Sequence, residues 1–213
     1  TVRQINATIT YNTHKLRLKM LPVTVGAGSM PTSTAPMCIS PVGIVNACHP
    51  RAAFAQAWDL AGLINAQETS FCRDGAAVMA AAVAEAFRPG ATVDSIIEAA
   101  TCYLYPISGR AMREAIANAI EAVNRVGDYE SLRREAYENP SSHLLAAFQN
   151  NPFETIPLTL GLFKLAEGDI ERCVLYGANF GRDADTIASM AGAIAGALHG
   201  IDAVRPDWWA QVK

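Results

Sequence analysis

The sequence predicts an all-α protein that folds as a compact, single-domain helical bundle. Three observations support this: 51% of the residues are hydrophobic, long alanine-rich stretches contain few strand-forming residues, and apolar residues recur at helical spacing. With 213 residues, the chain is long enough for one domain with a substantial core. It contains no repeat at a fixed period and no linker that would divide it.

Residues 1–25 form an atypical N-terminal segment, because their composition differs from that of the rest. Residues 5–10 alternate apolar and polar side chains of β-branched type, which predicts a short extended segment. Residues 21–48 are rich in Pro, Gly, Ser and Thr and predict a long loop. Loops of this length are uncommon in compact domains unless they are functional or disordered.

From Pro50 onward the sequence predicts a succession of helices. Pro50 suits the first turn of a helix. A second helix is predicted over 74–87, and a short one over 93–98 with Thr92 as its cap. Helical spacing places Phe54, Trp58, Ala61 and Asn65 on one side of the first helix.

The second half of the chain continues this helical pattern. A long amphipathic helix over 110–126 ends at Gly127, and the last long helix begins near Asp183 and ends near His199. Shorter helices are predicted over 129–137, 143–150, 153–166 and 169–178, and a terminal turn or short helix is predicted from 206.

Charge and hydropathy exclude two classes of partner. The net charge is −3 and no basic run suggests nucleic acid. The longest apolar run, residues 187–198, is shorter than the ~20 residues needed to cross a bilayer, so no membrane partner is expected. Five widely spaced cysteines favour neither a disulfide framework nor a zinc ribbon. They indicate reduced, mostly buried thiols in a cytoplasmic protein.

One acidic cluster stands where a glycine-containing turn enters a helix. Asp183, Asp185 and Thr186 can converge on one point there, and carboxylates with a hydroxyl suit a hard cation such as Mg²⁺. Acidic residues near a helix start can equally serve as caps that interact with the helix dipole. The spacing alone leaves both interpretations open.

The residues around this cluster resemble the metal-binding signature of the ADP-ribosylglycohydrolase family. Residues 174–197 contain its Asn, its Gly-x-Asp-x-Asp-Thr turn and its Ala/Gly-rich helix. Residues 154–160 and 206–209 resemble the segments before and after that signature. The resemblance covers residues 26–213, as the C-terminal part of a domain like that of the dinitrogenase-reductase-activating glycohydrolases.

The resemblance implies the family's all-helical fold, two Mg²⁺ ions, for which Mn²⁺ could substitute, and hydrolysis of ADP-ribosyl bonds of N- or O-glycosidic type. It implies Asp183, Asp185 and Thr186 as metal ligands. The expected partner is an ADP-ribose-like small molecule or an ADP-ribosylated protein. The sequence does not identify the catalytic acid or base.

Four residues are predicted to contact substrate. Gly28 and Ser29 could form a phosphate cradle, although such a sequence is also typical of a flexible turn. Met37 stands in a segment that resembles the family's substrate-side loop, with Cys38 in the position of the family's Arg. Arg182 replaces the commoner second Gly of the turn. It could bind a phosphate, or it could pair with the neighbouring aspartates.

The family's other metal ligands are a Thr/Ser-Asp-Asp cluster in an N-terminal segment. This sequence contains no Asp-Asp pair, and residues 1–25 contain no Asp or Glu. A missing N-terminal segment or a second chain could complete the site. The alternatives are an inactive family member that acts as a binding or structural protein, or a metal-dependent phosphoesterase. Elsewhere, Asp74 is predicted to cap a helix and Glu68 to contact substrate.

Overall fold

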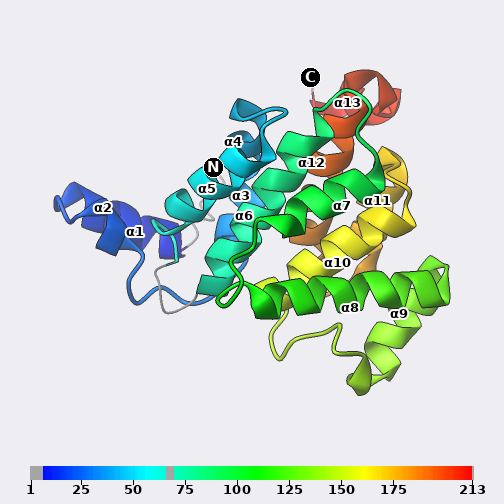
Figure 1. The fold of residues 1–213 in the computed structure, drawn as a ribbon, viewed down its shortest axis with the longest axis horizontal. Helices are drawn as coiled ribbons and strands as arrows, with labels where there is room; N and C mark the ends of the chain where they lie inside the picture. The colour runs from blue at the N-terminus through cyan, green and yellow to red at the C-terminus, as the bar shows by residue number, and fades with distance from the viewer. Residues whose placement is uncertain (1–6, 66–69, 213) are drawn as a thin grey trace.

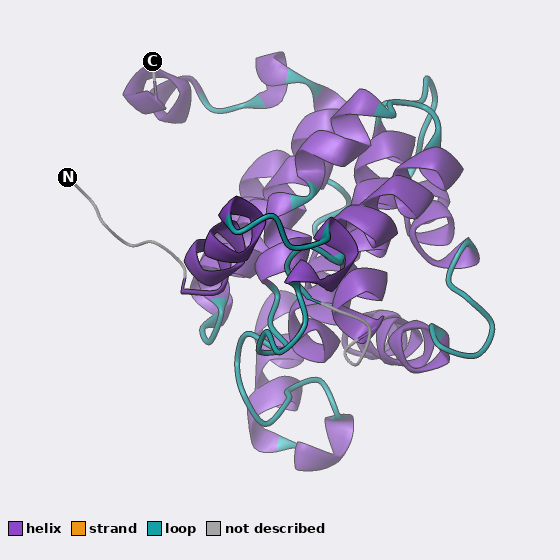
Figure 2. Cartoon of the chain, turned by 90° about the vertical axis from the view of Figure 1, so that its left-hand side faces the viewer, coloured by secondary structure: helices purple, strands orange, loops and turns teal. Residues whose placement is uncertain are grey.

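The computed structural model describes residues 7–65 and 70–212, and every regular element within them is a helix (Figure 2). This confirms the predicted all-α fold. The α-helices are α1 (Ala7–Arg17), α2 (Pro22–Val25), α3 (Thr34–Cys38), α4 (Ser40–Val45), α5 (Pro50–Ala61), α6 (Ser70–Ala86), α7 (Val93–Cys102), α8 (Arg110–Val126), α9 (Tyr129–Glu138), α10 (Pro152–Leu165), α11 (Ile170–Phe180), α12 (Ala184–His199) and α13 (Pro206–Val212), and 3₁₀ turns cover Pro140–Ser142 and Ile201–Ala203.

Helix α6 forms the centre of the core. Residues 76–86 are all buried, and most of them are alanines. The helix packs against α3, α4, α5, α7, α8, α10 and α12. A helix that is apolar on all sides belongs inside a bundle, and small alanine side chains let the neighbouring helices approach closely. On one edge of the bundle, α8 lies beside α10 (Figure 1).

The long periodic helices agree with the sequence prediction. Helix α8 has the predicted bounds and ends at Gly127, whose φ of 76° is the left-handed conformation that favours glycine. Thr92 caps α7 as predicted, and it forms a reciprocal capping box with Ser95. The predicted helix over 93–98 extends further, to Cys102.

The prediction of an extended segment over 5–10 is wrong for residues 7–10, which begin helix α1; residues 5 and 6 lie outside the described residues. Long-range contacts hold this helix. The amide of Asn12 donates to the carbonyls of Leu63 and Ile64. Lys15 Nζ donates to one carbonyl at the end of α2 and to another just after it. Alternation over a few residues does not outweigh such contacts.

The predicted loop over 21–48 contains three short helices, α2, α3 and α4. Two of them have a proline in the first turn, where a proline costs no helical hydrogen bond. Their brevity leaves little periodicity to detect in the sequence.

The predicted helix over 143–150 is also wrong, because this segment has no helical residues. Its backbone bonds to side chains instead. The Ala146 N–H donates to Glu154 and the Ala146 carbonyl accepts from Arg182. Polar side chains that are distant in the sequence therefore replace the helical hydrogen bonds here.

The five cysteines are thiols in the structure, and only part of the expectation of burial holds. Cys72 and Cys173 are buried, whereas Cys48 is half-buried and Cys38 and Cys102 are exposed. Burial raises the pKa of the Cys173 thiol to about 12. Within the described parts of the chain, no helix combines the length and the apolar character needed to cross a membrane.

Candidate functional site

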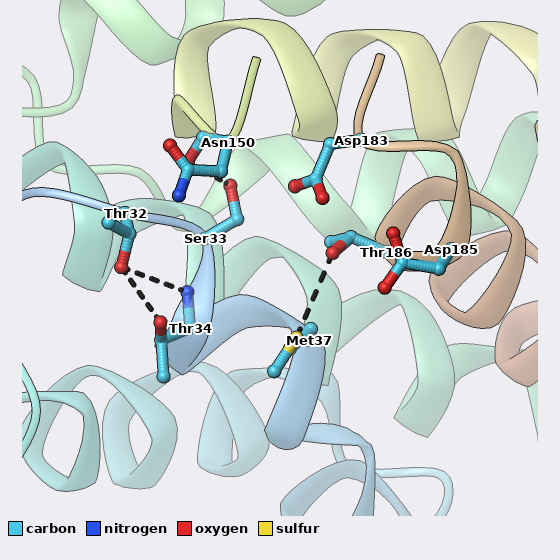
Figure 3. A pocket seen from close by; sticks show the side chains of 8 residues that line it. All are labelled: Thr32, Ser33, Thr34, Met37, Asn150, Asp183, Asp185 and Thr186. Carbon is cyan, nitrogen blue, oxygen red and sulfur yellow. Dashed lines mark hydrogen bonds between the residues drawn. The ribbon is translucent and has the colours of Figure 1, made fainter. Parts of the chain in front are cut away.

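A cavity of about 190 Å³ opens where the start of α12 faces α3 and the loop before it (Figure 3). Figure 3 shows polar side chains from three separate segments around this space, with one methionine among them. These segments are far apart in the sequence: the hydrogen bond between Ser33 and Asn150 spans 117 residues, and the one between Thr186 and Met37 spans 149. The lining residues are Thr32, Ser33, Thr34, Met37, Asn150, Asp183, Asp185 and Thr186.

The carboxylates belong to the turn that leads into α12. Gly181, with a φ of 95°, follows the last residue of α11, and Arg182 has a φ of 58°. Asp183 is the N-cap residue of α12 and Asp185 lies in its first turn. The reversal of the chain therefore brings both carboxylates and the Thr186 hydroxyl to the pocket, and the structure brings together all three predicted metal ligands.

The side chain of Asp183 makes no capping hydrogen bond to α12, so the capping interpretation does not account for it. Among the described residues, its buried Oδ2 atom has no hydrogen-bond partner. Burial raises the pKa of Asp183; the hydroxyl of Thr186 opposes this shift, and the charges of Asp185 and Glu154 add to it. A cation at this position would supply the missing partner of Oδ2.

Hydroxyl groups form the opposite wall of the pocket. Ser33 Oγ donates to the Asn150 carbonyl at 2.9 Å and lies 2.6 Å from Thr155 Oγ1. The Thr32 and Thr34 hydroxyls are 2.8 Å apart. Sequence reasoning missed Thr32, Ser33, Thr34 and Asn150 as site residues. Three consecutive hydroxyl residues were a visible signal, but nothing in the sequence related them to Asn150.

Met37, which the sequence predicted to contact substrate, does line the pocket. The Thr186 hydroxyl donates to its sulfur atom at 3.7 Å. A thioether is a weak acceptor, so this bond holds the hydroxyl only loosely and leaves its oxygen available to a cation.

The structure does not bring Gly28 and Ser29 to this pocket. The Ser29 hydroxyl forms hydrogen bonds with the Asn12 side chain, which belongs to α1. Gly28 has a φ of 76°, and a Cβ added there would meet no atom within 4 Å. The two residues shape a turn beside α1, and their predicted contact with phosphate stays a prediction.

Arg182 is bound to Glu154, not to the neighbouring aspartates. Its Nε and Nη2 atoms donate to the two carboxylate oxygens of Glu154 at 2.6 and 2.7 Å. Glu154 is fully buried, and its hydrogen bonds to the guanidinium, together with its charge, raise the pKa of Arg182. The alternative in which Arg182 pairs with Asp183 or Asp185 is therefore wrong.

The other two acidic predictions have different outcomes. Asp74 does not cap a helix: it lies inside α6, is fully buried, and accepts a hydrogen bond from Trp58 Nε1 at 3.1 Å. Glu68 lies outside the described residues, so its predicted contact with substrate stays a prediction.

The oxygen atoms of the pocket fit a hard divalent cation, and the unpartnered Oδ2 of Asp183 is the specific evidence. Over the described ranges, however, no group of three or more His, Cys, Asp or Glu side chains could hold a metal. Mg²⁺ commonly binds through one or two carboxylates and keeps several of its waters. Asp183, Asp185 and Thr186 could bind Mg²⁺ in this way, with two carboxylates and a hydroxyl, and more weakly than a site with more carboxylates.

Comparison with known proteins relates the chain to one family. A family model described as ADP-ribosylglycohydrolase matches residues 6–213. The uncharacterized protein YegU of Escherichia coli (strain K12) is 35% identical over 88 residues, which are 41% of this chain and 25% of that protein. The ADP-ribosylhydrolase ARH3 of Homo sapiens is 31% identical over 102 residues, which are 43% of this chain and 27% of that protein. The ADP-ribosylhydrolase ARH3 of Danio rerio is 54% identical over 41 residues, which are 19% of this chain and 11% of that protein. The chain thus matches about a quarter of the length of the first two relatives.

Proposed function

The chain belongs to the ADP-ribosylglycohydrolase family, and we propose from that premise that its pocket acts in the Mg²⁺-dependent hydrolysis of an N- or O-glycosidic ADP-ribosyl bond. The observation that carries the proposal is the convergence of Asp183, Asp185 and Thr186 on one cavity, with a buried carboxylate oxygen that lacks a partner. The proposed substrate is an ADP-ribosylated protein or an ADP-ribose-like small molecule.

Each wall of the pocket has a proposed role. Asp183, Asp185 and Thr186 would hold the cation, which would supply a Lewis acid that orients ribose hydroxyls and activates water. The Thr32, Ser33 and Thr34 hydroxyls opposite them offer donors and acceptors to a sugar.

The pocket holds no third carboxylate from the described residues, and both aspartates are assigned to the cation. General acid–base chemistry needs a further titratable group close to the reacting bond. We infer that this group, and further metal ligands, come from a segment or chain that docks at the pocket. A second Mg²⁺ would bind with those added ligands.

The small number of carboxylates also favours a second candidate function, in which the chain binds an ADP-ribose-like ligand without cleaving it. The hydroxyl wall would still contact the sugar, and the cation would bridge the protein and the ligand. A cytoplasmic location fits either function, because five thiols without disulfides are typical of a reducing compartment.

Incubation with an ADP-ribosylated peptide and Mg²⁺, with the docking segment or chain present, tests the proposed reaction through mass spectrometry of the products. We expect released ADP-ribose, and loss of the activity in Asp185→Asn or after chelation with EDTA. Release of inorganic phosphate would instead support a phosphoesterase. Binding of ADP-ribose without any cleavage, under conditions in which a longer relative cleaves the peptide, would support the binding function and contradict hydrolysis by this chain.

A further inference from the structure

The turn that presents the carboxylates adopts a backbone conformation that needs support. Gly181 and Arg182 both have positive φ values, of 95° and 58°. This conformation costs little at a glycine, but it is unfavourable at an arginine and persists only where the surroundings enforce it. A Cβ on Gly181 would lie 2.5 Å from Tyr137 Oη, so the turn is also packed tightly from outside.

The support comes from both sides of the turn. On one side, the Phe180 carbonyl accepts hydrogen bonds from Tyr137 Oη at 3.0 Å and from Arg133 Nε at 3.4 Å. On the other side, the Arg182 guanidinium binds both oxygens of Glu154 and also donates to the Ala146 carbonyl at 2.7 Å. The turn is therefore anchored to α9, to α10 and to the segment before α10.

Glu154 is the centre of this arrangement. It is 0% exposed, and one of its oxygens also accepts the Ala146 N–H at 2.7 Å. Glu154 and Arg182 thus bind both polar backbone groups of Ala146, in the segment that carries Asn150 to the pocket. One ion pair connects the wall that holds Asp183 with the wall that holds Asn150.

We propose that Glu154 and Arg182 are positioning residues, which fix the turn before α12 so that Asp183 and Asp185 reach the pocket together. The pair contacts neither cation nor substrate in this role. Arg182 serves the site by holding its backbone, in place of binding a phosphate. The effect on catalysis rests on the proposed function; the effect on the turn does not.

Two variants and a control test this inference. Glu154→Gln keeps the size of the side chain and removes its charge, and Arg182→Lys keeps the charge without the planar fork. The control is Glu171→Gln, which breaks another arginine–carboxylate pair, between Arg205 and Glu171 at 2.7 Å. Each protein is titrated with Mn²⁺ by electron paramagnetic resonance, and hydrogen exchange is measured by mass spectrometry.

We expect Glu154→Gln to bind Mn²⁺ about tenfold or more weakly, the usual cost of losing a group that orients metal ligands. Exchange should accelerate at 181–186 and 146–150 relative to α7, a local change that general destabilisation would not give. Arg182→Lys should show the same changes in smaller measure, because one ammonium cannot replace the fork. Glu171→Gln should leave both measurements as in the wild type.

Unchanged hydrogen exchange at 181–186 in Glu154→Gln would overturn the inference. Wild-type Mn²⁺ binding and exchange in Arg182→Lys would also overturn it, because a positive charge alone would then suffice. If the wild-type chain binds no Mn²⁺, the proposed metal site fails, and the exchange data still decide the inference. Where Glu154→Gln unfolds the whole chain, Arg182→Lys supplies the comparison.

Discussion

Asp74, which is buried, and Asp183, which is half-buried, each have a buried carboxylate oxygen without a hydrogen-bond partner among the described residues. For both residues, burial raises the pKa because it penalises the charged form. Asp183 lines the pocket, where a cation can offset that penalty. Asp74 instead lies beneath Trp58, whose indole N–H donates to its Oδ1 atom, and Arg73 stacks 3.4 Å from the centre of the Trp58 ring.

We expect Asp74→Asn to stabilise the protein at pH 7 by about 1 kcal/mol, the order of the penalty for burying a polar group that lacks a partner. The amide keeps an acceptor for Trp58 and removes the buried charge. Because the pKa of folded Asp74 is raised above its ordinary value of 3.8, the wild type loses stability as the pH rises from 3.8 through the raised value. The advantage of the variant should shrink as the pH falls toward 3.8.

Chemical denaturation of both proteins between pH 3.5 and pH 8 measures this difference. Asp59→Asn is the matched control, because the Asp59 side chain is 81% exposed and its pair with Arg73 should contribute little. A variant that is less stable than the wild type at pH 7, or a difference that does not change with pH, would contradict this account of Asp74.

At the scale of elements, the position of the pocket depends on the close packing of α11 against α12. Gly177 on α11 lies directly over Ala188 on α12: an added Cβ would lie 2.6 Å from the Ala188 Cα. Only a glycine permits this approach. The same two helices frame the turn that bears Asp183, so their spacing determines how the turn closes.

We expect Gly177→Ala to lower the free energy of unfolding by about 1–3 kcal/mol, because overpacking forces the helices apart. Gly196→Ala is the matched control in α12, since an added Cβ there meets no atom within 4 Å. That substitution should stabilise the chain by about 0.5–1 kcal/mol through helix propensity. Thermal unfolding of both variants measures the contrast, and equal effects of the two alanines would show that the close approach is unimportant.

At the scale of the whole molecule, the sequence predicted what is encoded locally. The 3.6-residue periodicity of α8 and the turn before α12 are local patterns, and both predictions agree with the structure. The short helices within 21–48 and the irregular segment 143–150 depend on contacts with distant parts of the sequence, such as Ser33 to Asn150 and Ala146 to Arg182. No local pattern reports those pairings, so the hydroxyl wall of the pocket could not be predicted.

We propose that Asp183, Asp185 and Thr186 form a divalent-cation site that faces a ribose-binding pocket. Titration of the chain and its Asp185→Asn variant with Mn²⁺, with and without ADP-ribose, examines this site. We expect weak binding, with a dissociation constant of roughly 10⁻⁴–10⁻³ M for so few carboxylates. Binding should be tighter when ADP-ribose is present, and both effects should be lost in the variant. Mn²⁺ binding that is equal in the two proteins, or that ADP-ribose leaves unchanged, would contradict it.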